Sequence, residues 1–126
     1  MSRRSIEIDG FHHANPIPGA SRVGPLVASS VVAARDPGSD RTPGDAEAQI
    51  ANLFHHVDAM LTTAGADWRH VVRMNFYVPD LAVRALINKP WLEHFPDADS
   101  RPARHTQLAA GQSAVSCEFL AYVDDQ

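Results

Sequence analysis

The alternation of hydrophobic and polar positions predicts short strands in the first third of the chain. Residues 5–9 alternate polar and apolar side chains, which is typical of a short first strand. Residues 21–34 carry several valines around two serines and are expected to form one long or two short buried strands. Pro25 predicts a bulge or a sheet edge near the start of this stretch, because proline has no N–H to donate to a neighbouring strand.

The clearest predicted element is an amphipathic helix in the middle of the chain. Thr42 is the expected N-cap, Pro43 suits the first helical position, and Asp45 imitates the acid of a capping box. Gly65 is the expected end of the helix. The apolar positions recur at helical spacing and are Ala46, Ile50, Leu53, Phe54, Val57, Met60, Leu61 and Ala64. The opposite face is expected to be polar, with Glu47, Gln49, Asn52, His56 and Thr63.

The second half of the chain predicts three more strands and one more helix. Residues 71–78 are expected to form a strand; its apolar face would hold Val72, Met74, Phe76 and Val78, and its polar face Arg73, Asn75 and Tyr77. Asp80 is expected to begin a second helix, which Pro90 should kink or break. Residues 101–108 and 113–123 are the last two predicted strands. This order predicts an α+β fold with a mainly antiparallel or mixed sheet.

Length and composition are those of one globular domain, residues 1–126. The net charge of −4 and the lack of a basic run argue against a nucleic-acid or membrane partner. The single cysteine, Cys117, excludes an internal disulfide, is expected to be a core thiol, and fits a reducing cytoplasm. No apolar run approaches the roughly 20 residues that span a membrane. The basic N-terminus leads into Glu7 and Asp9, so no signal peptide is expected.

The densest run of candidate chemistry lies between Ser100 and Thr106. Pro102 restricts the backbone at the start of a predicted strand. In an extended chain Arg104 and Thr106 share one face, and His105 points to the other. An arginine fork beside a hydroxyl group suits a planar carboxylate. The alternative is a surface arginine paired with an acid.

The run from Pro102 to Thr106 (PARHT), followed by a short loop and a last strand with an acid, resembles the RidA/YjgF/UK114 family. The resemblance covers nearly the whole chain. It implies a chorismate-mutase-like fold, with two helices on one face of a sheet and a homotrimer whose sheets meet as a central barrel. The chain is a divergent member by this comparison. Leu26 stands where the family has an aromatic residue, and Ser29-Ser30 stand where the family has Ser-Gly.

The resemblance also implies a reaction. Family members of the RidA and 2-aminomuconate deaminase types hydrolyse small enamine or imine carboxylic acids without a metal or a cofactor, in a cleft between subunits. A hydrolase acting on C–N bonds is therefore expected, and Arg104 would hold the substrate carboxylate. No HExxH or CxxC spacing predicts a metal site. The expected substrate-binding residues are Arg104, Asn88, Ser29, Thr106, Leu26 and Phe119.

The catalytic acid is the point at which the chain departs from the family. The family's glutamate aligns with Phe119, whereas Glu118 lies one residue away and so on the opposite face of the strand. A shorter loop at residues 109–114 would return Glu118 to the site by shifting the register of the last strand. Glu118 is the first candidate for the acid, and His105, supplied by the opposite face of a neighbouring subunit, is the second.

His12 and His13, in the Phe11–Ala20 loop, are further candidate bases, because loops of this kind often line sites.

The sequence leaves three candidate functions open. The first is the deaminase, and the second is a trimer that binds a small carboxylate without turning it over. The third and weakest is an endoribonuclease, since the chain is acidic and lacks a basic aromatic groove.

Overall fold

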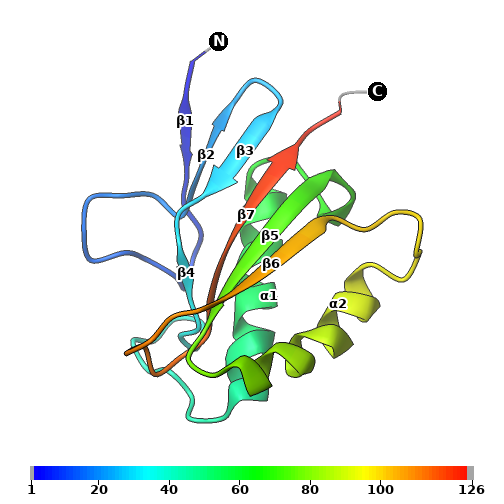
Figure 1. The fold of residues 1–126 in the computed structure, drawn as a ribbon. Coiled ribbons are helices and arrows are strands. Elements are labelled where there is room, and N and C mark those ends of the chain that lie inside the picture. Colours follow the sequence, from blue (N-terminus) through cyan, green and yellow to red (C-terminus); the bar gives the residue numbers. More distant parts are fainter. Residues whose placement is uncertain (1, 125–126) are drawn as a thin grey trace.

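One mixed sheet of seven strands forms the frame of the protein in the computed structural model, which describes residues 2–124 (Figure 1). The strands are β1 (Arg4–Ile6), β2 (Ala20–Val23), β3 (Leu26–Ser29), β4 (Val32–Ala33), β5 (Val71–Val78), β6 (Ala103–Leu108) and β7 (Ser116–Tyr122). Their order is β1-β2-β3-β7-β5-β6, and β4 also pairs with β7. Only β5 and β6 run parallel, so the prediction of a mixed sheet is confirmed.

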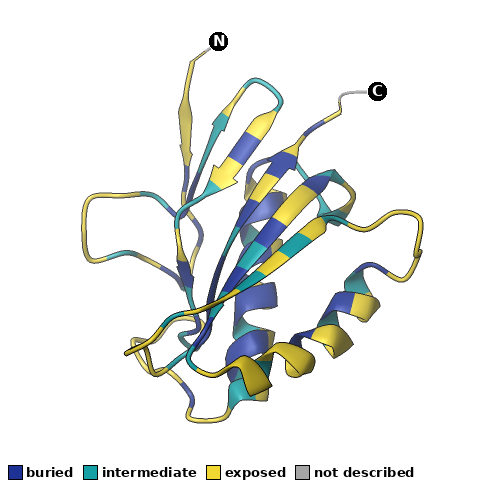
Figure 2. Cartoon of the chain, viewed as in Figure 1, coloured by how far each residue is buried: buried dark blue, intermediate teal, exposed yellow. Residues whose placement is uncertain are grey.

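The helices pack on one face of this sheet (Figure 1). They are α1 (Ala46–Thr63), α2 (Asn88–His94) and two 3₁₀ helices, η1 (Trp68–His70) and η2 (Leu81–Ile87). Buried and exposed residues alternate along β5 and β7, as Figure 2 shows, because one face of each strand meets the core. The predicted α+β fold with helices on one face is confirmed. No helix in residues 2–124 is long and apolar enough to cross a membrane.

The ends of α1 follow the rules of helix capping, with one correction. Thr42 is not the N-cap: Asp45 has an extended backbone, and its carboxylate accepts a hydrogen bond from the Ala48 N–H at 3.2 Å. Gly65 ends the helix as expected, with φ of 80°. The N–H groups of Gly65 and Ala66 donate to the carbonyls of Thr62 and Leu61, which closes the last turn.

Two residues assigned to the polar face of α1, Gln49 and His56, are buried, so that prediction was wrong for them. The Gln49 side chain donates to the Pro43 carbonyl at 2.8 Å and accepts from the Val115 N–H at 3.0 Å. His56 Nε2 lies 2.7 Å from the Arg35 carbonyl, to which it donates. These bonds to distant backbone groups remove most of the cost of burying polar atoms.

Buried His56 predicts that the protein loses stability as the pH falls through the range below about 6.5. Burial lowers the pKa of His56 below its ordinary value of 6.5. The unfolded side chain therefore takes up a proton before the folded one does, and stability that is complete at higher pH falls as the pH drops through this range. Urea unfolding at about pH 7.5 and about pH 5 measures the difference.

The matched variants for this test are His56→Gln and His55→Gln, which alter a buried and an exposed residue of the same helix. We expect the first variant to flatten the pH dependence and the second to change it much less, because His55 is a smaller cause of the His56 pKa shift than burial. His13, whose pKa burial also lowers, and Asp67, whose pKa the bond with Arg69 lowers, contribute to the slope that remains. Equal slopes in wild type and His56→Gln would contradict the assignment.

The structure corrects two further predictions, the role of Pro25 and the burial of Val72. Pro25 lies with Gly24 in the two-residue turn between β2 and β3, and not at a bulge or an edge. The bulge lies instead in β5, where the register shifts between Val71 and Arg73. It turns Val72 out of the core, with half of its surface exposed, and buries Val71 in its place.

The second helix breaks as Pro90 predicts. The 3₁₀ helix η2 ends at Ile87, and α2 then begins at Asn88. Pro90 is the third residue of α2, in the first turn, where a helix does not need the missing N–H. Asp80 caps η2 as expected, by accepting from the Ala82 N–H at 2.9 Å.

Candidate functional site

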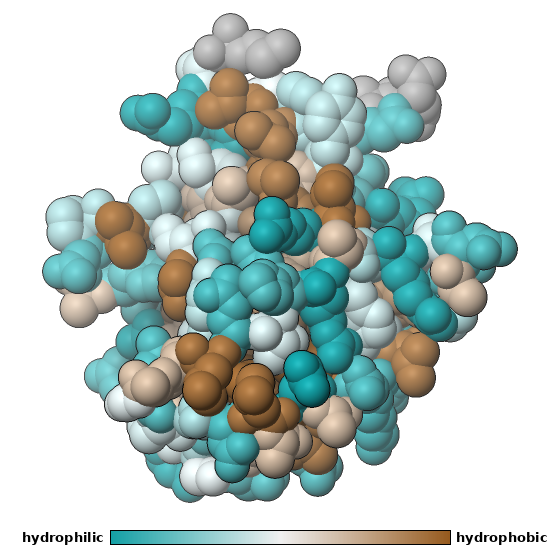
Figure 3. All heavy atoms as spheres, in the orientation of Figure 1, coloured by the Kyte–Doolittle hydropathy of each residue, from teal (hydrophilic) through white to brown (hydrophobic). Residues whose placement is uncertain are grey.

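The face of the sheet opposite the helices is open and carries both apolar and polar side chains. Its exposed apolar residues on β2, β3, β5 and β7 are Val23, Leu26, Val72, Leu120 and Tyr122. Figure 3 looks onto this open face and shows hydrophobic residues gathered where β2, β3 and β7 lie. A contiguous exposed apolar surface of this kind is typical of a face that meets another molecule.

Arg104 lies on the other, helix-bearing face. In the parallel pairing of β5 and β6 it lies beside Met74, a core residue. Its guanidinium sits over the Trp91 ring of α2, 5.1 Å from the ring centre. Burial, and then the nearby charge of Arg84, lower the pKa of Arg104. Within residues 2–124 no Asp or Glu pairs with Arg104, so it is not a surface arginine neutralised by an acid.

The alternation predicted for β6 is present. Thr106 lies beside Phe76 on the face of Arg104, and His105 lies beside Asn75 on the open face. Glu118 is paired with Asn75 from β7 and therefore also faces outward. The register shift that would bring Glu118 to the face of Arg104 does not occur. Within one chain Arg104 and Glu118 lie on opposite faces of the sheet.

Glu118 has a close hydrogen-bond partner on the open face. The Tyr77 hydroxyl donates to Glu118 Oε1, and this bond raises the pKa of Tyr77. The phenol leaves the second carboxylate oxygen of Glu118 for another partner. Tyr77, Asn75 and Arg73 come from alternate positions of one strand. The sequence pattern placed these three residues together on the polar face of that strand. It did not indicate that this face also carries Glu118 from β7.

The other predicted binding residues are spread over several environments. Ser29, at the end of β3, accepts a hydrogen bond from the Phe119 N–H at 2.8 Å. The Phe119 side chain is buried in the core. Leu26 is exposed on the open face, opposite Tyr122. Asn88 is exposed at the start of α2. The structure thus brings Ser29 near Glu118, and it places Asn88 and Arg104 on the helix side.

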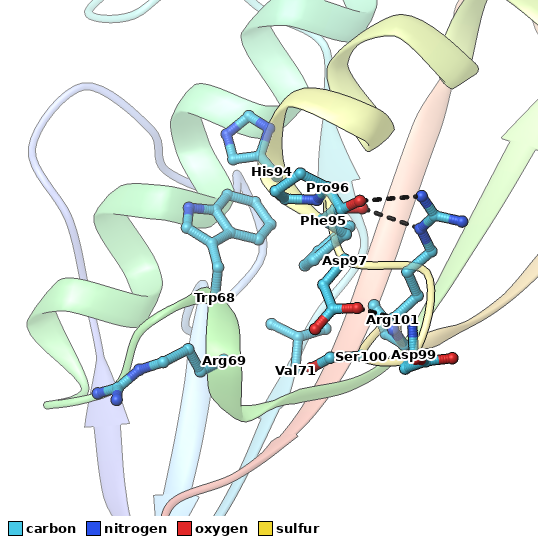
Figure 4. A pocket seen from close by; sticks show the side chains of 11 residues that line it. Trp68, Arg69, Val71, His94, Phe95, Pro96, Asp97, Asp99, Ser100 and Arg101 are labelled. Carbon is cyan, nitrogen blue, oxygen red and sulfur yellow. Dashed lines mark hydrogen bonds between the residues drawn. The ribbon is translucent and has the colours of Figure 1, made fainter.

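A separate hollow lies where η1 faces the loop after α2 (Figure 4). Its walls include Trp68, His94 and Arg101. Arg101 donates to the carbonyls of Phe95 at 2.9 Å and Pro96 at 3.3 Å. The two arginines on either side of Pro102 therefore differ: Arg101 holds a loop together, whereas Arg104 has no acceptor of this kind in the described residues.

The remaining candidates are two histidines and the cysteine. His13 packs edge-on against the Phe11 ring, and burial lowers its pKa. The His12 carbonyl accepts from Arg35 at 2.6 Å. Cys117 is fully buried and burial raises its pKa, which confirms the prediction of a core thiol. In residues 2–124 no group of three or more His, Cys, Asp or Glu side chains is placed to hold a metal ion.

Solved structures with the same fold come from several organisms. RidA from the Antarctic bacterium Psychrobacter sp. PAMC 21119 superimposes with a TM-score of 0.86 at 23% identity, covering 95% of this chain and 99% of that one. The YjgF gene product of E. coli gives a TM-score of 0.81 at 21% identity, covering 94% and 98%. At this level of identity the similarity establishes the fold.

Sequence comparison establishes the family. A RutC family protein of Aquifex aeolicus (strain VF5) is 31% identical over 58 residues, an alignment that spans 46% of this chain and 46% of that protein. The family model described as endoribonuclease L-PSP matches residues 13–119, which is most of the chain. This chain therefore belongs to the endoribonuclease L-PSP family, the RidA/YjgF/UK114 family that its PARHT strand resembles.

Proposed function

We propose that this protein hydrolyses small imine or enamine carboxylic acids and that Arg104 binds the substrate carboxylate. The observation that carries the proposal is the half-buried Arg104 guanidinium with no acid partner in residues 2–124. A cation that has lost part of its hydration gains most from an anion that replaces the lost water. The Trp91 ring covers one face of the guanidinium plane, and edge-on N–H groups suit a bidentate carboxylate.

The reaction needs orientation, a water molecule and a proton carrier. Water oxygen forms a bond to the imine carbon, and Glu118 accepts one of the water protons. That proton then passes to the amino nitrogen of the carbinolamine formed from the protonated imine, and the C–N bond breaks with its electron pair going to nitrogen. The departing ammonia takes the remaining hydroxyl proton as the carbonyl forms. The products are a 2-oxo acid and ammonium. Because the iminium carbon is already electrophilic, holding substrate and water together supplies much of the acceleration.

One chain does not present Arg104 and Glu118 to the same molecule, because the sheet separates them. The proposal therefore includes a cleft between copies, in which one copy provides Arg104 and its neighbour provides Glu118 or His105. Two features support it. Arg104 is on β6, an edge strand of the described sheet, and the open face that carries Glu118 has an exposed apolar surface. A homotrimer closes such contacts around a three-fold axis.

The alternative is a protein that binds a carboxylate without turnover. The bond between Tyr77 and Glu118 favours it, because that bond occupies one oxygen of the proposed acid. It predicts that 2-oxo acids bind to Arg104 while ammonia release stays at the rate of the uncatalysed reaction. An endoribonuclease remains the weaker alternative, since the net charge of −4 opposes RNA binding.

The test is a coupled assay of ammonia release from 2-iminopropanoate made in situ, repeated with 2-aminomuconate. We expect wild-type protein to accelerate release and Glu118→Gln to lower kcat by about 100-fold, a typical effect of losing a general base. The matched control is Glu93→Gln, which alters an exposed carboxylate on α2. Binding of 2-oxobutanoate without turnover would instead establish the alternative, and absence of both would overturn the proposal.

Mixing two inactive variants tests the cleft between copies. Arg104→Ala subunits keep Glu118, and Glu118→Gln subunits keep Arg104. If each site takes one residue from each of two copies, mixed assemblies regain part of the activity. If both residues act from one copy, mixing restores nothing, and if Glu118 has no role, Glu118→Gln is already active before mixing.

A further inference from the structure

A groove with an apolar lining lies between the first turns of α1 and the segment formed by η2 and α2. Its volume is about 460 Å³. α1 packs against η2, and η2 leads directly into α2, so both walls belong to the helices on one face of the sheet (Figure 1). The apolar residues that line the groove are Ala48, Ile50, Ala51, Ala85, Leu86 and Pro90.

Small side chains explain why the space between these helices is hollow. Ala48 and Ala51 are three positions apart and share one face of α1, and Ala85 lies across from them on η2. A methyl group does not reach far enough to fill the gap. Ala51, Ala85 and Leu86 are exposed, so the groove opens to solvent. No residue of the sheet lines it, and contact between copies through the open face of the sheet does not cover it.

The rim of the groove is acidic. It carries three carboxylates and one ammonium group, from Asp45, Glu47, Glu93 and Lys89. The Asp45 carboxylate caps α1, whereas Glu47, Glu93 and Lys89 form no ion pair within residues 2–124. An apolar groove with unpaired carboxylates at its rim is complementary to an apolar stripe that is flanked by cations.

We propose that this groove binds an amphipathic helix of a partner protein, with the apolar stripe of that helix over the alanines and its lysine or arginine side chains beside Glu47 and Glu93. A hollow between two helices accepts a third helix by ridges-into-grooves packing, and small residues let the backbones approach closely. An extended segment gains less, because the groove offers no strand edge with free N–H and C=O groups.

The helices of this chain do not match the groove, so a second copy is not the partner. α1 carries Glu47 and Asp58 and has no lysine or arginine. η2 and α2 each contain a single residue of that kind, Arg84 and Lys89. Among the described helices none has an apolar stripe flanked by cations on both sides. The partner is therefore a different, basic protein.

The inference goes beyond the proposed reaction and does not rest on it. Arg104 and Glu118 do not line the groove. A protein that hydrolyses no imine can still bind a helix here, and variants of the groove are expected to keep the hydrolase activity of the wild type. The two proposals therefore fail separately.

The first experiment measures fluorescence anisotropy of three labelled peptides with the full chain in its native assembly. The first peptide has leucines at helical spacing, flanked by lysines, over about four turns. The second has glutamate in place of each lysine, and the third has the composition of the first in an order without helical spacing. We expect the first to bind at least about 10-fold more tightly than either of the others, and its affinity to fall as salt is added. No binding of the lysine peptide, or an equal affinity for either of the other two, would overturn the proposal.

Filling the groove tests where the peptide binds. Ala51→Trp places a large ring between the helices and is expected to weaken binding of the lysine peptide by about 10-fold or more, because the ring occupies the space of the peptide side chains. Thr62→Trp adds the same ring at an exposed position near the end of α1, outside the groove, and is expected to leave the affinity unchanged. Equal affinities of the two variants would exclude this groove.

Reversing the rim charges tests the recognition of cations. Glu47→Lys combined with Glu93→Lys is expected to reverse the preference, so that the glutamate peptide binds more tightly than the lysine peptide. Asp9→Lys combined with Asp99→Lys makes the same change in net charge at exposed positions outside the groove and is expected to keep the original preference. A cooperative thermal transition shows that each variant is folded. A folded rim variant that still prefers the lysine peptide would contradict the proposal.

Discussion

Replacing Arg104 by alanine is expected to lower kcat/KM for imine hydrolysis by about 100-fold or more, with little change in stability. A bidentate carboxylate makes two charge-assisted hydrogen bonds with the guanidinium, and each contributes about 1.5–3 kcal/mol. The variant also loses the contact between the guanidinium and the Trp91 ring, which contributes about 0.5–1 kcal/mol to the free energy of unfolding. Initial rates of ammonia release give the first quantity, and thermal unfolding gives the second.

Two controls separate binding by the guanidinium from a general effect of charge. Arg104→Lys keeps the charge but loses the planar fork, so it should recover only part of the activity. Arg69→Ala removes an arginine that is 84% exposed and paired with Asp67, and it should leave kcat/KM unchanged. Wild-type kcat/KM in Arg104→Ala would show that another residue binds the carboxylate.

Replacing Phe54 by alanine is expected to lower the free energy of unfolding by about 3–5 kcal/mol. Phe54 is only 4% exposed, and its ring lies 4.8 Å from the His94 ring and 5.6 Å from the Trp68 ring, between ring centres. It thereby joins α1 to α2 and to the η1 turn. Truncation leaves a cavity among rigid rings, which relax little to fill it. Urea unfolding measures the loss.

Leu92→Ala is the matched control, because Leu92 is a large apolar residue of α2 with half of its surface exposed. Its expected cost is within about 0.5 kcal/mol. A loss of less than about 1 kcal/mol in Phe54→Ala would show that this face of α1 is not packed as the structure places it.

Several elements could be predicted from local pattern alone. The strand at residues 71–78 has the predicted bounds, and the helix ends at Gly65 as predicted. Pro90 marks the predicted break between η2 and α2. These features depend on hydrophobic spacing and on the backbone preferences of Gly and Pro, which act over a few residues.

Other features depend on partners that are distant in sequence. Gln49 and His56 appear polar and exposed in the helical pattern, yet they are buried, because Val115 and Arg35 supply backbone partners for them. Val72 is turned out of the core by a bulge against β7, and no property of its own strand indicates that bulge. Long-range hydrogen bonds and register decide such cases.

The sequence by itself determined that Arg104 and His105 point to opposite faces of a strand, because side chains alternate in any extended chain. The resemblance to the family also predicted that Glu118 stands one position from the family's acid. Only the tertiary structure decided that the helices cover the face of Arg104 and that Glu118 faces outward beside Tyr77. The reason is physical: alternation sets the relative sides of neighbours within one strand, whereas the pairing of β5 with β6 and β7 and the packing of the helices set which side is which.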